Sequence, residues 1–252
     1  MKISSFSAAE IELLTRLEFE GKEIYTREQI VSFCKTKLKA VYLIKKLLEK
    51  KRLRKTVKNV YLLVPMKAPG GQWAGNEYII AKALARGANY YIGYSPVFSS
   101  YGFTDQVARV IYVINDHYSA KKDIFGTAYK MVKVMSDKLY GLEERRIGSE
   151  FVAFPKKERA MIDVFEFYAT DRAAGILNKQ LKQLNLPLFI EYVAQYPVRI
   201  IRRKIGYLLE QLGIEGTRLN KIKVGDKGYS PLYGKCSGRG KVNKKWRIII
   251  NG

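Results

Sequence analysis

The chain has 252 residues, 47% of them hydrophobic, which is enough to bury one or two sizeable cores. Lys and Arg number 46 against 23 acidic residues, so the formal net charge of +23 predicts a polyanionic partner, and no apolar run reaches the roughly 18 residues that a membrane-spanning helix needs. With only Cys34, Cys236 and His117 available, a zinc finger, a His-based metal site and a Ser-His-Asp relay lack their residues, so we expect no metal and no cofactor.

The N-terminal stretch MKISSFSAAEIELL has an early acidic residue, Glu10, and no uninterrupted apolar core. It is therefore not typical of a signal peptide. Two cysteines far apart in the sequence suit a reducing compartment better than a disulfide scaffold. Together these features predict a soluble, cytoplasmic protein without a membrane partner.

Two capping boxes predict two helices near the N-terminus. In this pattern a Ser or Thr caps the helix and a Glu or Gln three residues later returns a hydrogen bond to the cap. The pairs here are Ser7 with Glu10 and Thr26 with Gln29. We expect the first helix to end near Gly21 and the second helix to be short.

A third helix is predicted from about Thr36 to Lys51, and its residues separate into two faces at about 100° per residue. One face is apolar and consists of Ala40, Val41, Ile44, Leu47 and Leu48. The other face carries four lysines around one aromatic residue: Lys35, Lys39, Tyr42, Lys46 and Lys50. Tyr42 could take part in binding, or it could merely cover the aliphatic stems of the lysines.

The next stretch, LRKTVKNVYLLV, predicts a β-hairpin with its turn near Lys58 and Asn59. Three helices followed by a basic hairpin is the element order of a winged helix-turn-helix, which we assign to residues 1–65. In that motif the third helix can enter the major groove while the hairpin follows the backbone. The predicted DNA-binding residues are Lys35, Lys39, Tyr42, Lys46, Lys50, Arg52, Arg54 and Lys58.

A solvated lysine face is the plain alternative to a DNA-binding face. Between Lys35 and Lys58 the sequence has eleven basic residues and only one acidic residue, Glu49. Ordinary protein surfaces mix both signs. The imbalance, together with the element order, favours DNA binding.

Residues 66–252 are predicted to form a larger mixed α/β domain with a helical C-terminal part, which makes the fold class α+β. The Pro- and Gly-rich stretch VPMKAPGGQWAG separates this domain from the first. An α/β part, about residues 76–155, contains the helix NEYIIAKALARG, the strand NYYIGY and two β-rich stretches separated by the polar turn region HYSAKKD. The part from about residue 156 to 252 is expected to be helical and basic, with RIIRRKIGYLLEQLG as its clearest amphipathic helix.

The order of these pieces resembles the AbiEi-like antitoxins of type IV toxin–antitoxin, or abortive-infection, systems. The resemblance covers most of the chain: the winged helix-turn-helix, YYIGYSPVFSSYGFTDQ, FPKKERAMIDVF, RRKIGYLLEQLG and the terminal NKKWRIIING. It implies a non-enzymatic transcriptional repressor that acts in phage defence, binds an operator of its own operon and counteracts a nucleotidyltransferase-like toxin. In that picture residues 66–252 carry the antitoxin activity.

A second basic surface is predicted near the C-terminus, formed by Arg202, Arg203, Arg239, Lys241 and Lys244. It could extend the DNA footprint, bind RNA, dock an acidic partner or simply be solvated. The nearby stretch GKCSGRGK is Gly-rich and basic, but Val242 stands where a phosphate-binding loop needs Ser or Thr. We therefore expect a flexible basic loop there.

The alternative function is a nucleic-acid-processing enzyme, a nuclease or a nucleotidyltransferase-like protein, that uses the winged helix to deliver substrate. Its candidate carboxylates are Asp137, Glu143, Glu144, Glu158 and Asp163. Their spacing is generic, so we favour structural roles, with Glu158 at the start of a surface helix and Asp163 either capping a helix or paired internally. No heptad pattern is long enough for a coiled coil, and we expect a monomer or a weak dimer, which could bind inverted operator repeats.

Overall fold

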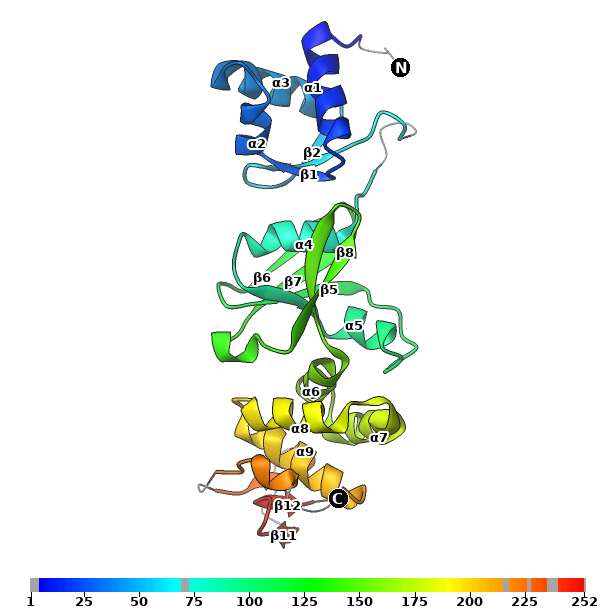
Figure 1. Cartoon of the computed structure of the whole chain (residues 1–252), viewed down its shortest axis with the longest axis vertical. Coiled ribbons are helices and arrows are strands. Elements are labelled where there is room, and N and C mark those ends of the chain that lie inside the picture. Colours follow the sequence, from blue (N-terminus) through cyan, green and yellow to red (C-terminus); the bar gives the residue numbers. More distant parts are fainter. Residues whose placement is uncertain (1–4, 69–72, 215–217, 226–227, 235–239, 252) are drawn as a thin grey trace.

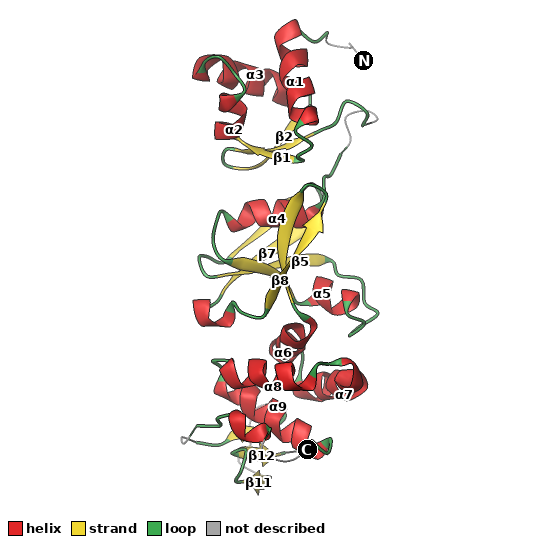
Figure 2. Cartoon of the chain, viewed as in Figure 1, coloured by secondary structure: helices red, strands yellow, loops and turns green. Residues whose placement is uncertain are grey.

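The computed structural model describes residues 5–68, 73–214, 218–225, 228–234 and 240–251. The chain is elongated, and three units follow one another along its long axis (Figure 1). We call them the N-terminal unit, up to residue 68, the middle unit, residues 73–155, and the C-terminal unit, from residue 156. The fold is mixed α+β, and helices dominate the C-terminal unit (Figure 2).

Residues 5–68 of the N-terminal unit form three helices and three short strands. In chain order they are α1 (Ala8–Phe19), β1 (Ile24–Thr26), α2 (Arg27–Ser32), α3 (Lys37–Glu49), β2 (Leu53–Val57) and β3 (Val60–Leu63). Both predicted capping boxes are confirmed, at Ser7 with Glu10 and at Thr26 with Gln29. The predicted hairpin is also present, and Asn59 adopts the positive φ of 62° that its tight turn requires.

Strand β1 was absent from the sequence-based expectation and completes an antiparallel sheet of order β1-β3-β2. Alternate residues of this sheet point to opposite faces. Tyr25 and Tyr61 face the three helices and belong to the core of the N-terminal unit. Ile24, Val57 and Val60 pack with the core of the rest of the chain. The sheet therefore joins two cores.

The middle unit is built around a four-stranded sheet of order β4-β5-β7-β6, in which β5 and β7 are parallel. A separate hairpin, β8-β9, lies beside it. The elements are α4 (Glu77–Ala85), β4 (Tyr90–Gly93), α5 (Ser95–Ser100), β5 (Val110–Asn115), β6 (Ala120–Ile124), β7 (Thr127–Lys133), η2 (Ser136–Lys138), β8 (Leu142–Ile147) and β9 (Glu150–Pro155).

The polar stretch HYSAKKD was expected to be a turn, and this expectation is partly wrong. Residues from Ala120 onward form strand β6 at the edge of the sheet. Lys121 and Asp123 are exposed whereas Ile124 is buried. Charged residues are common on edge strands, because they protect the open edge from pairing with another chain, and they hide the apolar alternation from a sequence reading.

In the C-terminal unit, the residues that the structure describes form four α-helices that pack above a small three-stranded sheet of order β10-β12-β11. Its elements are α6 (Lys157–Phe167), α7 (Thr170–Gln180), η3 (Leu181–Gln183), α8 (Leu186–Gln195), α9 (Arg199–Gln211), η4 (Leu219–Lys221), β10 (Ser230–Pro231), β11 (Lys241–Asn243) and β12 (Ile248–Ile250). Within the described residues, every helix is too short or too polar to cross a lipid bilayer.

Candidate nucleic-acid interface

Helix α3 lies on the side of the N-terminal unit that is remote from the middle unit, whereas the sheet lies on the near side (Figure 1). The helix begins where the Thr36 side chain accepts a hydrogen bond from the backbone N–H of Lys39. Ala40, Leu43, Ile44 and Leu47 are buried on its inner face. This arrangement leaves the opposite face of α3 open to solvent.

The open face of α3 carries apolar side chains among its lysines. Leu38 is 84% exposed, Tyr42 58% and Val41 39%. The prediction that Val41 belongs to the buried face is therefore wrong, and Leu43 takes its place. The buried residues follow the spacing i, i+3, i+4, i+7 from Ala40, which is the inner stripe of a single helix packed on one side.

Five lysines surround these apolar residues. Lys35, Lys37 and Lys45 are exposed, and Lys39 and Lys46 are half-buried. Lys46 pairs with Glu49 at 3.0 Å, and this hydrogen bond raises the pKa of Lys46. Its Nζ also lies 5.9 Å from the centre of the Tyr42 ring. Four residues of this face were not among the predicted site residues: Lys37, Leu38, Val41 and Lys45. They could have been identified only by predicting correctly which residues of α3 are buried.

Lys50, the last member of the predicted lysine stripe, is directed into the N-terminal unit. Its ammonium contacts Glu10 Oε2 at 2.6 Å and donates to the backbone carbonyl of Ser5 at 2.8 Å. The hydrogen bond from Lys50 lowers the pKa of Glu10 although burial opposes this change. Lys50 is thus held by an internal partner, and the prediction that it contacts DNA is corrected.

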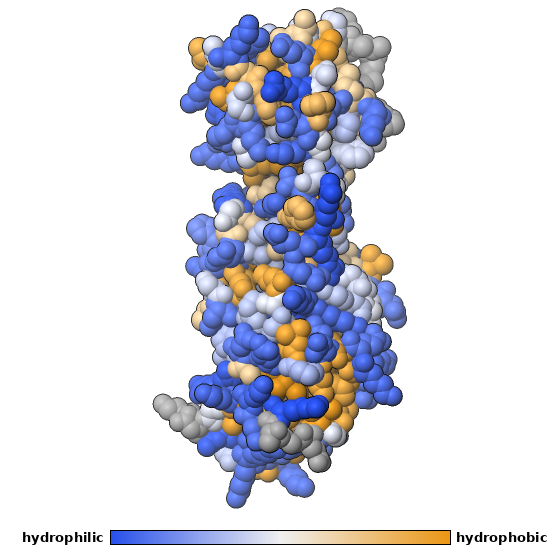
Figure 3. All heavy atoms as spheres, viewed as in Figure 1, coloured by the Kyte–Doolittle hydropathy of each residue, from blue (hydrophilic) through white to orange (hydrophobic). Residues whose placement is uncertain are grey.

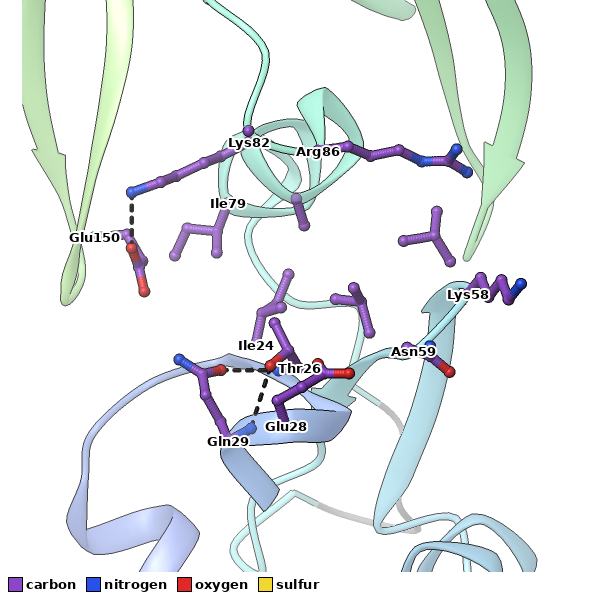
Figure 4. Close-up of a pocket in the computed structure, with 14 residues that line it drawn as sticks. Ile24, Thr26, Glu28, Gln29, Lys58, Asn59, Ile79, Lys82, Arg86 and Glu150 are labelled. Carbon is purple, nitrogen blue, oxygen red and sulfur yellow. Dashed lines mark hydrogen bonds and ion pairs between the residues drawn. The ribbon is translucent and has the colours of Figure 1, made fainter. Parts of the chain in front are cut away.

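The basic residues of the hairpin also lie away from the open face of α3. Arg52 donates to the carbonyl of Pro65 at 2.9 Å. Arg54 donates to the carbonyl of Trp73 at 2.7 Å, and its guanidinium carbon lies 3.6 Å from the centre of the Phe125 ring in the middle unit. Lys58 lines a cavity between the two units (Figure 4). The hairpin therefore faces the middle unit, and the predicted phosphate contacts of Arg52 and Arg54 are corrected. Lys58 is exposed, and its predicted phosphate contact stays a prediction.

The predicted second basic surface is only partly assembled. Arg203 is 3% exposed, and it donates to the carbonyls of Val224 and Gly228 at 2.8 and 3.0 Å, so it holds neighbouring segments together. Burial lowers the pKa of the half-buried Arg202. Lys241 and Lys244 are exposed. Arg239 lies outside the described residues.

Two of the candidate carboxylates are engaged in structural contacts. Asp163 is fully buried and accepts a hydrogen bond from Arg159 at 2.6 Å, and the Tyr91 hydroxyl lies 3.1 Å from the same carboxylate. Burial raises the pKa of Asp163 while Arg159 opposes the rise. Glu158 accepts from the backbone N–H of Asn185 at 2.9 Å. No group of three or more His, Cys, Asp or Glu within the described ranges is arranged to hold a metal ion.

The geometry of Arg159 explains why this network is stable. Its guanidinium lies between the rings of Tyr91, Tyr140 and Tyr196, at 5.6, 5.3 and 5.0 Å from their centres. A buried cation is costly unless a counter-charge compensates it, and the faces of aromatic rings attract it further. Asp163 supplies the first and the three rings supply the second, so the carboxylate is committed to Arg159.

Comparison with known proteins shows the fold alone. No protein-family model matches the sequence, and no curated protein matches it. The structure is similar to the crystal structure of the Rv2827c protein from Mycobacterium tuberculosis, with a TM-score of 0.64 and 14% sequence identity. The alignment covers 97% of this chain and 92% of the other. The two chains therefore share their arrangement from end to end.

Proposed function

We propose that the N-terminal unit is a winged helix-turn-helix and that the protein is a sequence-specific, double-stranded DNA-binding transcriptional repressor. In this proposal α3 enters the major groove and presents Lys35, Lys39, Tyr42 and Lys46 to the DNA. Lys37 and Lys45 join this set. Lys50, Arg52 and Arg54 leave it, because their side chains are engaged within the protein or face the middle unit.

The observation that carries the proposal is the open, cationic face of α3 at the remote end of the molecule. The α3 region offers five lysines there, and Glu49 is the one acidic residue of the helix. Lysine ammonium groups can bind phosphates and can also donate to guanine, and apolar side chains such as Leu38 and Val41 can contact the methyl group of thymine. The face thus combines groups for affinity with groups for sequence reading.

We also propose that the protein is the antitoxin of a type IV toxin–antitoxin operon, which it represses while counteracting a nucleotidyltransferase-like toxin. The support for this part is the resemblance of residues 90–106 and 154–165 to AbiEi-like antitoxins. If it holds, expression of a neighbouring nucleotidyltransferase-like gene should arrest growth, and co-expression of this chain should restore it. Arrest that persists with the antitoxin present would contradict this role.

The DNA-binding proposal is tested by footprinting and affinity measurements on DNA upstream of the protein's own gene. The variant K35A/K39A should bind at least tenfold more weakly. Each lost phosphate contact should also reduce the slope of log affinity against log salt by roughly 0.9, so the double variant should lose up to about 2 from that slope.

A matched control removes the same charge elsewhere. Lys179 is an exposed residue of α7 and Lys182 is exposed in the following η3 turn, both in the C-terminal unit. The variant K179A/K182A should bind as the natural protein does. If both double variants bind equally weakly, the affinity depends on the net charge of the protein and not on the face of α3. If the natural protein does not bind duplex DNA at low salt, the proposal is wrong.

A further inference from the structure

A cavity of about 560 Å³ lies between the sheet of the N-terminal unit and helix α4 of the middle unit (Figure 4). Ile24, Val57 and Val60 line it from the sheet, and Ile79 and Ala83 line it from α4. Figure 3 shows apolar residues at the narrowing between these two units. Each unit therefore contributes an apolar wall to a shared space.

This cavity is an open cleft between the two units, and its volume can be compared with those of known ligand sites. Sites for small organic ligands typically enclose about 300–1,000 Å³ and are lined mainly by apolar groups with a few polar ones. The cavity matches that description in both size and lining.

Charged residues at the edge of the cavity indicate the kind of ligand. On one side Lys82 pairs with Glu150 at 2.9 Å, so their charges compensate each other. On the other side Lys58 and Arg86 extend from different units (Figure 4). Both are exposed, and neither forms an ion pair within the described part of the chain. Apart from Glu150, the one carboxylate among the described lining residues is Glu28, which lies on the wall formed by the N-terminal unit.

The conformation of Arg86 strengthens this interpretation. Arg86 ends α4 in the left-handed region, with φ of 55°, which is uncommon for a residue other than glycine. Its guanidinium lies 5.4 Å from the centre of the Tyr118 ring, which holds it beside the cavity. Two cations from opposite walls therefore lie at the same end of the apolar space (Figure 4).

We propose that this cavity binds a small organic anion with an apolar body, such as a medium-chain carboxylate. The apolar part would lie against the half-buried Ile24, Val60 and Ala83, and the anionic group would lie near Lys58 and Arg86. Because the ligand contacts both units, its binding free energy stabilises their present arrangement. The proposal does not depend on DNA binding.

The test uses 8-anilinonaphthalene-1-sulfonate, an aromatic anion that fluoresces in apolar sites, as the probe. The full-length protein should bind it saturably. Ala83→Trp fills the cavity and should weaken binding at least tenfold, whereas Phe19→Trp adds an indole at a position that is 88% exposed and should leave it unchanged. Circular dichroism checks that each variant is folded.

A second pair of variants tests the charges, and it serves also if Ala83→Trp does not fold. Lys58→Gln with Arg86→Gln should weaken probe binding about tenfold, and Lys179→Gln with Lys182→Gln should not. Decanoate should displace the probe at a concentration at least tenfold lower than decanol, which has the same chain length without the charge. Equal displacement by the two would overturn the anionic part of the proposal, and equal probe affinity in all variants would overturn the site itself.

Discussion

The carboxylate of Glu10 both caps helix α1 and ties it to the end of helix α3. It closes the capping box with Ser7 and at the same time pairs with Lys50, 40 positions further along the chain. The capping box could be predicted, because its two members are three residues apart. The contact with Lys50 could not, since it depends on how α1 and α3 pack. Lys50 therefore looked like a free cation in the sequence although it is held internally.

The variant Glu10→Gln separates these two roles. Glutamine can still close a capping box, so the change mainly removes the ion pair and should lower the free energy of unfolding at pH 7 by about 1 kcal/mol. The pKa of Glu10 is lowered in the folded protein, so its stabilising contribution is present above the ordinary value of 4.5 and is lost as the pH falls through the lower, folded-state pKa. The difference between the two proteins, measured by chemical denaturation, should therefore shrink as the medium is acidified to about pH 3. A difference that stays constant from neutral to acid pH would assign the effect to something other than this carboxylate.

At the scale of single elements, helices with strong caps were predictable and short strands were not. The start of α3 at Thr36 and the turn at Asn59 follow from local hydrogen bonding and φ preferences, which the sequence displays directly. Strands β1 and β6 depend on partners elsewhere in the chain, and their few residues show no clear alternation. The orientation of α3 about its own axis was misjudged by about one position, because Leu38 and Val41 are apolar residues on an open face.

Helix α9 offers an element-scale test of packing. A Cβ atom on Gly206 would collide with the indole of Trp246, which is 2% exposed and donates a hydrogen bond to Glu210 at 2.7 Å. Gly206→Ala should therefore lower the free energy of unfolding by about 1–3 kcal/mol, the usual cost of overpacking. A Cβ atom on Gly175 in α7 would meet nothing within 4 Å among the described residues, so Gly175→Ala should instead raise stability, by up to about 1 kcal/mol. Thermal unfolding of both variants checks this, and a stabilising Gly206→Ala would mean that Trp246 does not pack on α9.

At the scale of the whole molecule, the fold class was predictable from the sequence, but the direction in which the hairpin faces was not. Local patterns identified three helices and a hairpin, yet both faces of the resulting sheet are covered, one by the helices and one by the middle unit. The covering of the second face depends on contacts between segments far apart, such as Arg54 with Phe125. This orientation of the hairpin places Arg54 and Lys58, two of the seven predicted DNA-binding cations, at the junction between units.

The same contact predicts how the two cores unfold relative to one another. Separate cores joined by a small junction unfold as one only while the junction holds. Arg54→Ala removes the stacking on Phe125 and the hydrogen bond to Trp73, and it should destabilise the N-terminal unit by about 1–2 kcal/mol. Differential scanning calorimetry should then show a transition at lower temperature for this unit and an unchanged transition for the rest of the chain.

Lys55→Ala, at an exposed position on the same strand, is the control and should leave both transitions unchanged. Phe125→Ala should act in the same direction as Arg54→Ala, and the two changes together should cost less than their sum, because they remove one shared contact. Additive effects, or a shift of both transitions by the same amount, would show that the junction is held elsewhere.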